Sequence, residues 1–134
     1  PLAIADEVLL VVNPDISSIA DALKTKILVE MLDNTVTGVV LNKVGNVATE
    51  FSREKVEKLL EVPILEIVPE DVNVRHAAAA KTPVVVKDPE SATAIAFKRL
   101  AASLAGEEIP DEPVVVEKNE GFVKKLARAM FGGK

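Results

Sequence analysis

The sequence contains no cysteine, tryptophan or tyrosine, and it has only four phenylalanines. Without cysteine the chain has no disulfides, no thiolate metal sites and no cysteine nucleophile, which is typical of a cytosolic protein. Because aromatic residues are scarce, Leu, Val, Ile and Ala must fill the core. They are abundant enough to do so, since 49% of the 134 residues are hydrophobic.

Several functional motifs are also missing. No run of 18 apolar residues and no signal peptide is present, and no Gly-rich phosphate loop follows a strand. No carboxylate pair is placed for acid–base catalysis, so we predict no catalytic residue and no metal site. The one histidine, His76, lies among alanines on a predicted helix, and we expect it at the surface or in helix packing rather than in catalysis.

Charge is spread unevenly along the chain. The net charge is −5, which argues against broad nucleic-acid binding. Residues 106–118 carry −4 and two prolines, so we interpret them as an acidic linker. Residues 119–134 carry +3, which leaves −4 on residues 1–105.

Continuous apolar runs alternate with helical patterns. Runs at Glu7–Asn13, Val36–Asn42 and Val62–Val68 suit strands buried on both faces, and Pro83–Val86 suits a short fourth strand or extended segment. Such alternation predicts an α/β fold in which helices flank a parallel sheet.

Polar residues mark the helix starts. Asp15 or Ser17 can cap the first helix, and Ser52 and Asp71 can cap the next two. The last body helix is expected to start with Asp88 as its cap and Pro89 in its first turn. Spacing of three and four residues predicts that the first helix buries one apolar stripe, composed of Ile16, Ile19, Ala20, Leu23, Ile27 and Met31.

Ligands of parallel α/β sheets bind beyond the carboxyl ends of the strands. Here those ends are Asn13-Pro14-Asp15, Asn42-Lys43 and Pro69-Glu70-Asp71. An Asn can donate to and accept from the edge of a purine base, but Gly45 departs from the Asn-Lys-x-Asp pattern of GTP-binding proteins, so guanine selectivity is not supported. Each strand end can also be a simple turn or helix cap.

Residues 119–134 predict a basic amphipathic helix. Apolar side chains share one face, and Lys124, Lys125 and Arg128 lie opposite. The apolar face comprises Phe122, Val123, Leu126 and Met130, with Phe131 at its boundary. The pattern suits binding to an anionic membrane surface; the alternative is a helix that docks on its own domain or pairs with a copy of itself.

Taken in order, three segments and the basic tail resemble the C-terminal half of MinD-like ATPases of archaeal type, within the ParA/MinD family of deviant-Walker P-loop NTPases. The segments are ADEVLLVVNPDISSIADALKT (5–25), GVVLNKV (38–44) and IVPEDVNVRHAAAAKTPVV (67–85). The resemblance implies that residues 1–105 are part of a P-loop NTPase domain. The phosphate loop and magnesium-binding residues belong to the family's N-terminal half, so we expect a fragment that binds ATP or ADP with Mg²⁺ only in its full-length parent and does not hydrolyse ATP alone.

The resemblance also implies residue roles. Asn42 matches the adenine-contacting Asn, and Pro69, Glu70 and Asp71 line the other side of the base. Asn13, Asp15 and Ser17 lie near an ATP-dependent homodimer interface, although Asp15 is shorter than the family's frequent Glu. The apolar face of the tail inserts into the membrane, and its three basic residues contact lipid phosphates.

The resulting hypothesis is part of a cytoplasmic ATPase that binds the inner face of the cell membrane and positions cell division or other machinery. MinC-like or MinE-like regulators are possible partners, and no specific nucleic acid is expected. The alternatives are a DNA-partitioning ParA-type ATPase, which the acidic body disfavours, an iron–sulfur carrier, which the absence of cysteine disfavours, and a non-enzymatic interaction module. We also expect poor solubility, because the strand at Glu7–Asn13 would present an unpaired apolar edge.

Overall fold

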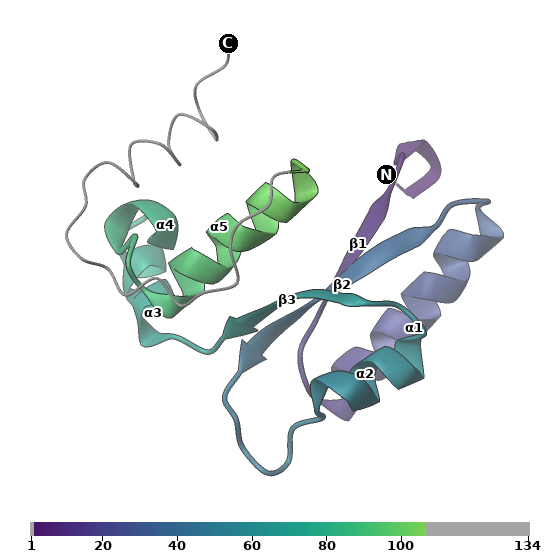
Figure 1. The fold of residues 1–134 in the computed structure, drawn as a ribbon, viewed down its shortest axis with the longest axis horizontal. Coiled ribbons are helices and arrows are strands. Elements are labelled where there is room, and N and C mark those ends of the chain that lie inside the picture. The colour runs from purple at the N-terminus through teal and green to yellow at the C-terminus, as the bar shows by residue number, and fades with distance from the viewer. Residues whose placement is uncertain (1, 107–134) are drawn as a thin grey trace. The chain divides into compact units, whose positions relative to one another are not determined.

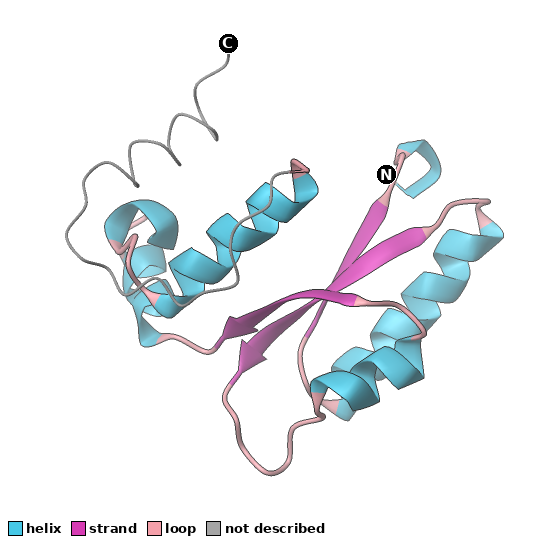
Figure 2. Cartoon of the chain, in the orientation of Figure 1, coloured by secondary structure: helices cyan, strands magenta, loops and turns pink. Residues whose placement is uncertain are grey.

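The computed structural model describes residues 2–106 of the chain. Within them, β1 (Val8–Val12), β2 (Val36–Val44) and β3 (Ile64–Pro69) form one parallel sheet in the order β1-β2-β3. The helices that follow and precede these strands confirm the predicted α/β class (Figures 1 and 2). They are a short 3-10 turn at Leu2–Ile4, α1 (Ile16–Met31), α2 (Arg53–Leu60), α3 (Val72–Ala79), α4 (Val84–Lys87) and α5 (Ala92–Leu104).

The sheet carries helices on both faces (Figure 1). On one face, α1 and α2 pack on alternate strand residues in the main core, which includes Val12, Val39 and Ile64. On the other face, Ala96 of α5 packs with Val40 and Val68. Adjacent residues of β2 thus point into different cores, which explains why this strand is a continuous apolar run rather than an alternating one. The prediction that the first strand is buried on both faces is wrong at Val11, which is 64% exposed on the edge strand β1.

Side-chain caps begin three helices where the sequence predicts them. The Asp15 carboxylate accepts from the Ser18 N–H at 2.8 Å, which selects Asp15 over Ser17 as the cap of α1. Ser52 caps α2, and Asp71 caps α3 by accepting from the Asn73 N–H at 2.8 Å. Each cap satisfies a backbone donor that the first turn leaves unpaired.

The predicted buried stripe of α1 is wrong. Only Ile19 of that stripe is buried, and the helix packs on the sheet through Ile19, Ala22 and Val29. The other apolar members face solvent, and they include Ile16 (65% exposed) and Met31 (75%). The packed face carries the smaller residues Ala22 and Val29, which let the helix approach the sheet closely.

Two local predictions after α3 are also wrong. Pro83–Val86 is not a strand: the Val86 and Lys87 N–H groups both donate to the Pro83 carbonyl, and the segment forms the single-turn helix α4. Local hydrogen bonds override the β preference of valine because no strand of the described sheet pairs with this segment. Asp88 accepts from the Ser91 N–H in a turn, and Ser91 rather than Asp88 caps α5 by accepting from the Ala94 N–H at 3.2 Å.

Candidate functional site

The carboxyl ends of β2 and β3 lie side by side. Val44 is the register partner of Pro69, and the Glu70 N–H donates to the Val44 carbonyl at 3.0 Å. Asn42 lies inside β2, which extends two residues beyond the predicted strand end. The loop after β2 and the Pro69-Glu70-Asp71 segment are therefore neighbours, as parallel strand ends are expected to be.

The Asn42 side chain lies near the carboxyl end of β2. It is half-buried, and it makes no hydrogen bond to any other residue between 2 and 106. The next residue, Lys43, has φ of 55°, a left-handed conformation that is unusual for lysine. An amide that is partly shielded and has no protein partner can still donate to and accept from one ligand edge.

The segment after β3 is held from α5. The Thr93 hydroxyl, on a side chain that is 2% exposed, donates to the Pro69 carbonyl at 3.2 Å. Asp71 is half-buried and one of its oxygens is used as the α3 cap, while Glu70 is exposed. Thr93 was not predicted as a site residue, and no spacing in the sequence indicates that a helix 24 residues away supports Pro69.

A loop joins this region to the end of β1. Glu50 reaches back with both carboxylate oxygens to the N–H groups of Gly45 and Asn46, each at 2.8 Å. The next residue, Phe51, donates its N–H to the Pro14 carbonyl at 3.0 Å. Sequence reasoning missed both residues, because loop contacts of this kind have no periodic signal.

The corner after β1 is fixed by the first turn of α1. The Asn13 N–H donates to the Ser18 hydroxyl at 2.9 Å, and Asp15 caps the helix. Ser17 is exposed. The solvent-facing apolar stripe of α1 begins directly after this corner and consists of Ile16, Ala20, Leu23, Ile27 and Met31.

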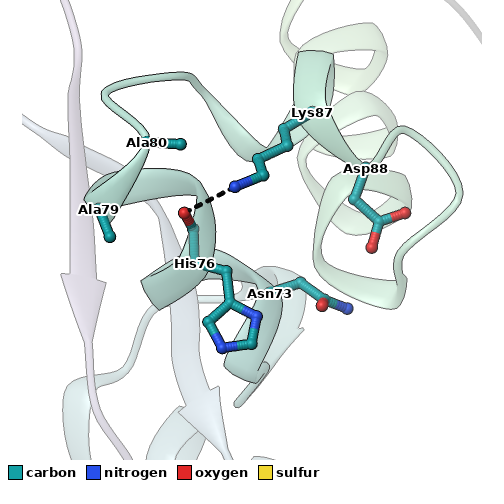
Figure 3. Close-up of a pocket in the computed structure, with 6 residues that line it drawn as sticks. All are labelled: Asn73, His76, Ala79, Ala80, Lys87 and Asp88. Atoms are coloured by element: carbon teal, nitrogen blue, oxygen red, sulfur yellow. Dashed lines mark hydrogen bonds between the residues drawn. The ribbon is translucent and has the colours of Figure 1, made fainter.

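A separate hollow of about 640 Å³ lies between α3 and α4, lined by Asn73, His76, Ala79, Ala80, Lys87 and Asp88 (Figure 3). The Lys87 ammonium donates to the His76 carbonyl at 2.9 Å, and the His76 ring points away from that ammonium. Polar side chains do not converge on one point here, and none of the predicted base-contacting residues lines the hollow. His76 is exposed, as expected.

Among residues 2–106, no group of three or more His, Asp or Glu side chains could hold a metal ion. The described helices also include none long and apolar enough to cross a membrane. The predicted linker beyond Gly106 and the predicted membrane-binding residues lie outside the described part of the chain. These residues are Phe122, Val123, Lys124, Lys125, Leu126, Arg128, Met130 and Phe131.

Comparison with known proteins matches residues 6–84 to the CobQ/CobB/MinD/ParA nucleotide binding domain. An uncharacterised ATP-binding protein of Methanocaldococcus jannaschii is 41% identical over 128 residues, which cover 96% of this chain and 48% of that protein. The chain thus spans about half the length of this relative.

Solved structures agree with the sequence comparison. The septum site-determining protein MinD of Pyrococcus horikoshii, complexed with Mg-ADP, is 31% identical with a TM-score of 0.70 over 75% of this chain and 41% of that one. MinD in the Aquifex aeolicus MinC:MinD cell division complex is 30% identical, with a TM-score of 0.73 over 81% of this chain and 46% of that one. These matches confirm the predicted fold.

Proposed function

Since the chain belongs to the CobQ/CobB/MinD/ParA nucleotide-binding domain family, we propose that it forms the base-binding, dimerising and membrane-targeting part of a MinD-like ATPase. One observation carries the proposal: the unpartnered Asn42 amide on β2 lies at the same sheet edge as the Pro69-Glu70-Asp71 segment after β3. Such an ATPase positions cell division or other cellular machinery. The Pyrococcus horikoshii relative is itself a septum site-determining protein.

The ligand proposed for this edge is the adenine of ATP or ADP. Asn42 offers one donor and one acceptor, which complement the N6 amine and a ring nitrogen of adenine. Pro69 provides an apolar wall for the ring, with Glu70 and Asp71 beside it. This geometry fits the base but not the triphosphate, because the sequence has no Gly-rich phosphate loop and the described residues hold no metal-binding cluster. We therefore assign only the base, and not the phosphates or Mg²⁺, to the described residues.

The proposed dimer surface is the corner at Asn13, Asp15 and Ser17, continued by the apolar stripe of α1. Leu23 is 41% exposed and Ile27 is 50% exposed, so the stripe has apolar area to bury against a second copy of the ATPase. Association through this surface would hide side chains that α1 cannot bury in its own core.

The proposed membrane anchor is the predicted helix in residues 119–134. Its apolar side chains can contribute roughly 1.5–3 kcal/mol each if fully buried, and each basic residue adds about 1 kcal/mol at an anionic surface. Incomplete insertion and the ordering of a short helix reduce that total, so one tail binds weakly and reversibly. Two tails in a dimer make the second contact intramolecular, which raises the affinity strongly. We therefore propose a cytoplasmic protein that binds the inner face of the membrane reversibly, with MinC-like or MinE-like regulators.

Base binding is tested by titrating the 134-residue chain with adenosine and guanosine while recording amide and side-chain NMR shifts. We expect weak binding, with a Kd of about 1 mM, because the base alone provides few contacts. Adenosine should shift the Asn42 side-chain signal, and Asn42→Ala should abolish binding. Equal shifts with guanosine, or binding that Asn42→Ala leaves intact, would contradict the proposed role of the edge.

Membrane binding is tested by co-sedimentation with anionic vesicles. Phe122→Glu and Leu126→Glu should each reduce the sedimented fraction. Val86→Glu is the matched control, because Val86 is 67% exposed on α4 and its substitution adds the same charge to the body. Undiminished sedimentation of the tail variants would refute the anchor, and salt-sensitive retention on DNA instead would favour a DNA-partitioning ATPase.

A further inference from the structure

The loop between β2 and α2 has a backbone that needs support. Lys43, the last residue but one of β2, and Asn46, in the loop itself, both have left-handed φ values, 55° and 59°. This region costs free energy for residues with a side chain, more for lysine than for asparagine, and such conformations persist only where surrounding contacts maintain them. The loop begins after Val44, two residues beyond Asn42, so contacts that hold the loop also constrain the end of β2 beside the proposed base contact.

Glu50 provides that support. Its carboxylate accepts from two consecutive backbone donors, Gly45 N–H to Oε1 and Asn46 N–H to Oε2, both at 2.8 Å. Hydrogen bonds to a charged acceptor are the stronger kind, and a pair to adjacent donors also fixes orientation. Gly45 allows this approach, because a Cβ at this position would lie only 3.2 Å from the Glu50 Oε1.

The residue after Glu50 is attached to a different strand end. Phe51 donates its N–H to the Pro14 carbonyl at 3.0 Å, in the corner between β1 and α1. Its ring packs against the main core, and the Lys55 ammonium lies 4.5 Å from the ring centroid. In Figure 1 the β2–α2 loop accordingly extends away from the sheet and returns beside the start of α1.

We infer that Glu50 and Phe51 are positioning residues that couple the loop after β2 to the Asn13-Pro14-Asp15 corner. Glu50 holds the loop at Gly45 and Asn46, and its neighbour Phe51 holds Pro14, so a shift at one end displaces the other through a single peptide unit. The inference rests on the proposed function for its consequence: occupation of the base site changes the geometry of the dimer corner. By linkage, if base binding changes the affinity between two copies by some factor, dimerisation changes the affinity for the base by that same factor.

The mechanical part is tested without any ligand, by amide hydrogen exchange of the 134-residue chain measured by NMR. Glu50→Gln keeps the shape but loses the charge. Glu54→Gln is the matched control, since Glu54 is exposed in the first turn of α2. We expect Glu50→Gln to accelerate exchange about tenfold at Gly45 and Asn46, as for the loss of one good hydrogen bond, and also at Phe51 and at the corner amides of Asn13 and Ser18.

The control should leave all these rates unchanged. Faster exchange at Gly45 and Asn46 with no change at Phe51, Asn13 or Ser18 would overturn the coupling. If Glu50→Gln unfolds the chain, Glu50→Asp serves instead, because it keeps the charge and only shortens the side chain. The same amides should then exchange faster than in the unmodified chain.

The functional part is tested by adenosine titration. In the unmodified chain, adenosine should shift both the Asn42 side-chain signal and the Ser18 amide, while Glu50→Gln should retain the first shift and lose the second. A shift at Asn42 alone in the unmodified chain would refute the coupling. No shift anywhere would refute base binding and hence the proposed function, while the Glu50–Phe51 connection would still be decided by the exchange rates.

Discussion

Two neighbouring residues of α1 provide a sharp test of which face of this helix forms the core. Val29 is 0% exposed and packs in the main core, whereas Ile27 is 50% exposed. The sequence periodicity alone predicts the opposite order, with Ile27 buried and Val29 outside the apolar stripe. Comparing the stability lost on replacing each residue by alanine therefore distinguishes between the two possible orientations of α1.

The expected costs differ by more than the measurement error. Val29→Ala removes two buried carbons at about 0.8 kcal/mol each and leaves a cavity, so it should destabilise the chain by about 2 kcal/mol. Ile27→Ala removes three carbons that are already half in water, and alanine is the better helix former, so its cost should be about 1 kcal/mol or less.

Urea unfolding followed by circular dichroism at 222 nm measures both, since the chain has no Trp or Tyr to report by fluorescence. With slopes of about 1–2 kcal/mol per molar urea, Val29→Ala should lower the midpoint by about 1–2 M. An equal or larger loss for Ile27→Ala at low micromolar concentration would refute the orientation of α1. A loss for Ile27→Ala that appears only as protein concentration rises would instead support the proposed dimer surface.

Three further predictions concern acid stability, strand packing and solubility. The Ile64 N–H, which donates to the Glu57 carboxylate, and the nearby Arg53 lower the pKa of Glu57. The contribution of Glu57 to the free energy of unfolding is therefore present at neutral pH and is lost as pH falls through the lowered pKa. When urea midpoints are measured against pH, Glu57→Gln should flatten the acid side of this stability profile. Gly38→Ala should destabilise the chain by about 1–3 kcal/mol in the same assay, because the added methyl meets the Leu65 side chain on β3; a midpoint equal to that of the unmodified chain would contradict this packing. Val11→Lys should increase the soluble fraction after ultracentrifugation, because Val11 is 64% exposed on the edge strand β1. If the unmodified chain is a fully soluble monomer with a sharp, cooperative unfolding transition, this edge does not cause aggregation.

Much of the fold was predictable because it depends on local chemistry. The strand β2 is a continuous apolar run, which a sheet covered on both faces accommodates. Asp15, Ser52 and Asp71 cap helices as single residues do, through donors two or three positions ahead. The order of these elements then leaves few topologies other than a parallel sheet.

Predictions failed where two local preferences compete. Val84, Val85 and Val86 favour a strand, yet no described strand pairs with them, so one turn of helix satisfies their backbone. Likewise Asp88 and Ser91 can both cap a helix. The residues from Asp88 to Ser91 form a turn, so α5 starts after it and Ser91 is its cap.

The sequence by itself determined the α/β class, the starts of α1, α2 and α3, and the placement of Pro69-Glu70-Asp71 at the end of β3, because each depends on residues close in the chain. Only the tertiary structure decided which stripe of α1 packs on the sheet, since this helix carries apolar residues on more than one face. It also decided that Glu50 holds Gly45 and that Phe51 holds Pro14. A backbone N–H or C=O group is present at almost every residue, so the residue type at Gly45 or Pro14 does not indicate such a contact in the sequence. These contacts could therefore be identified only from the folded structure.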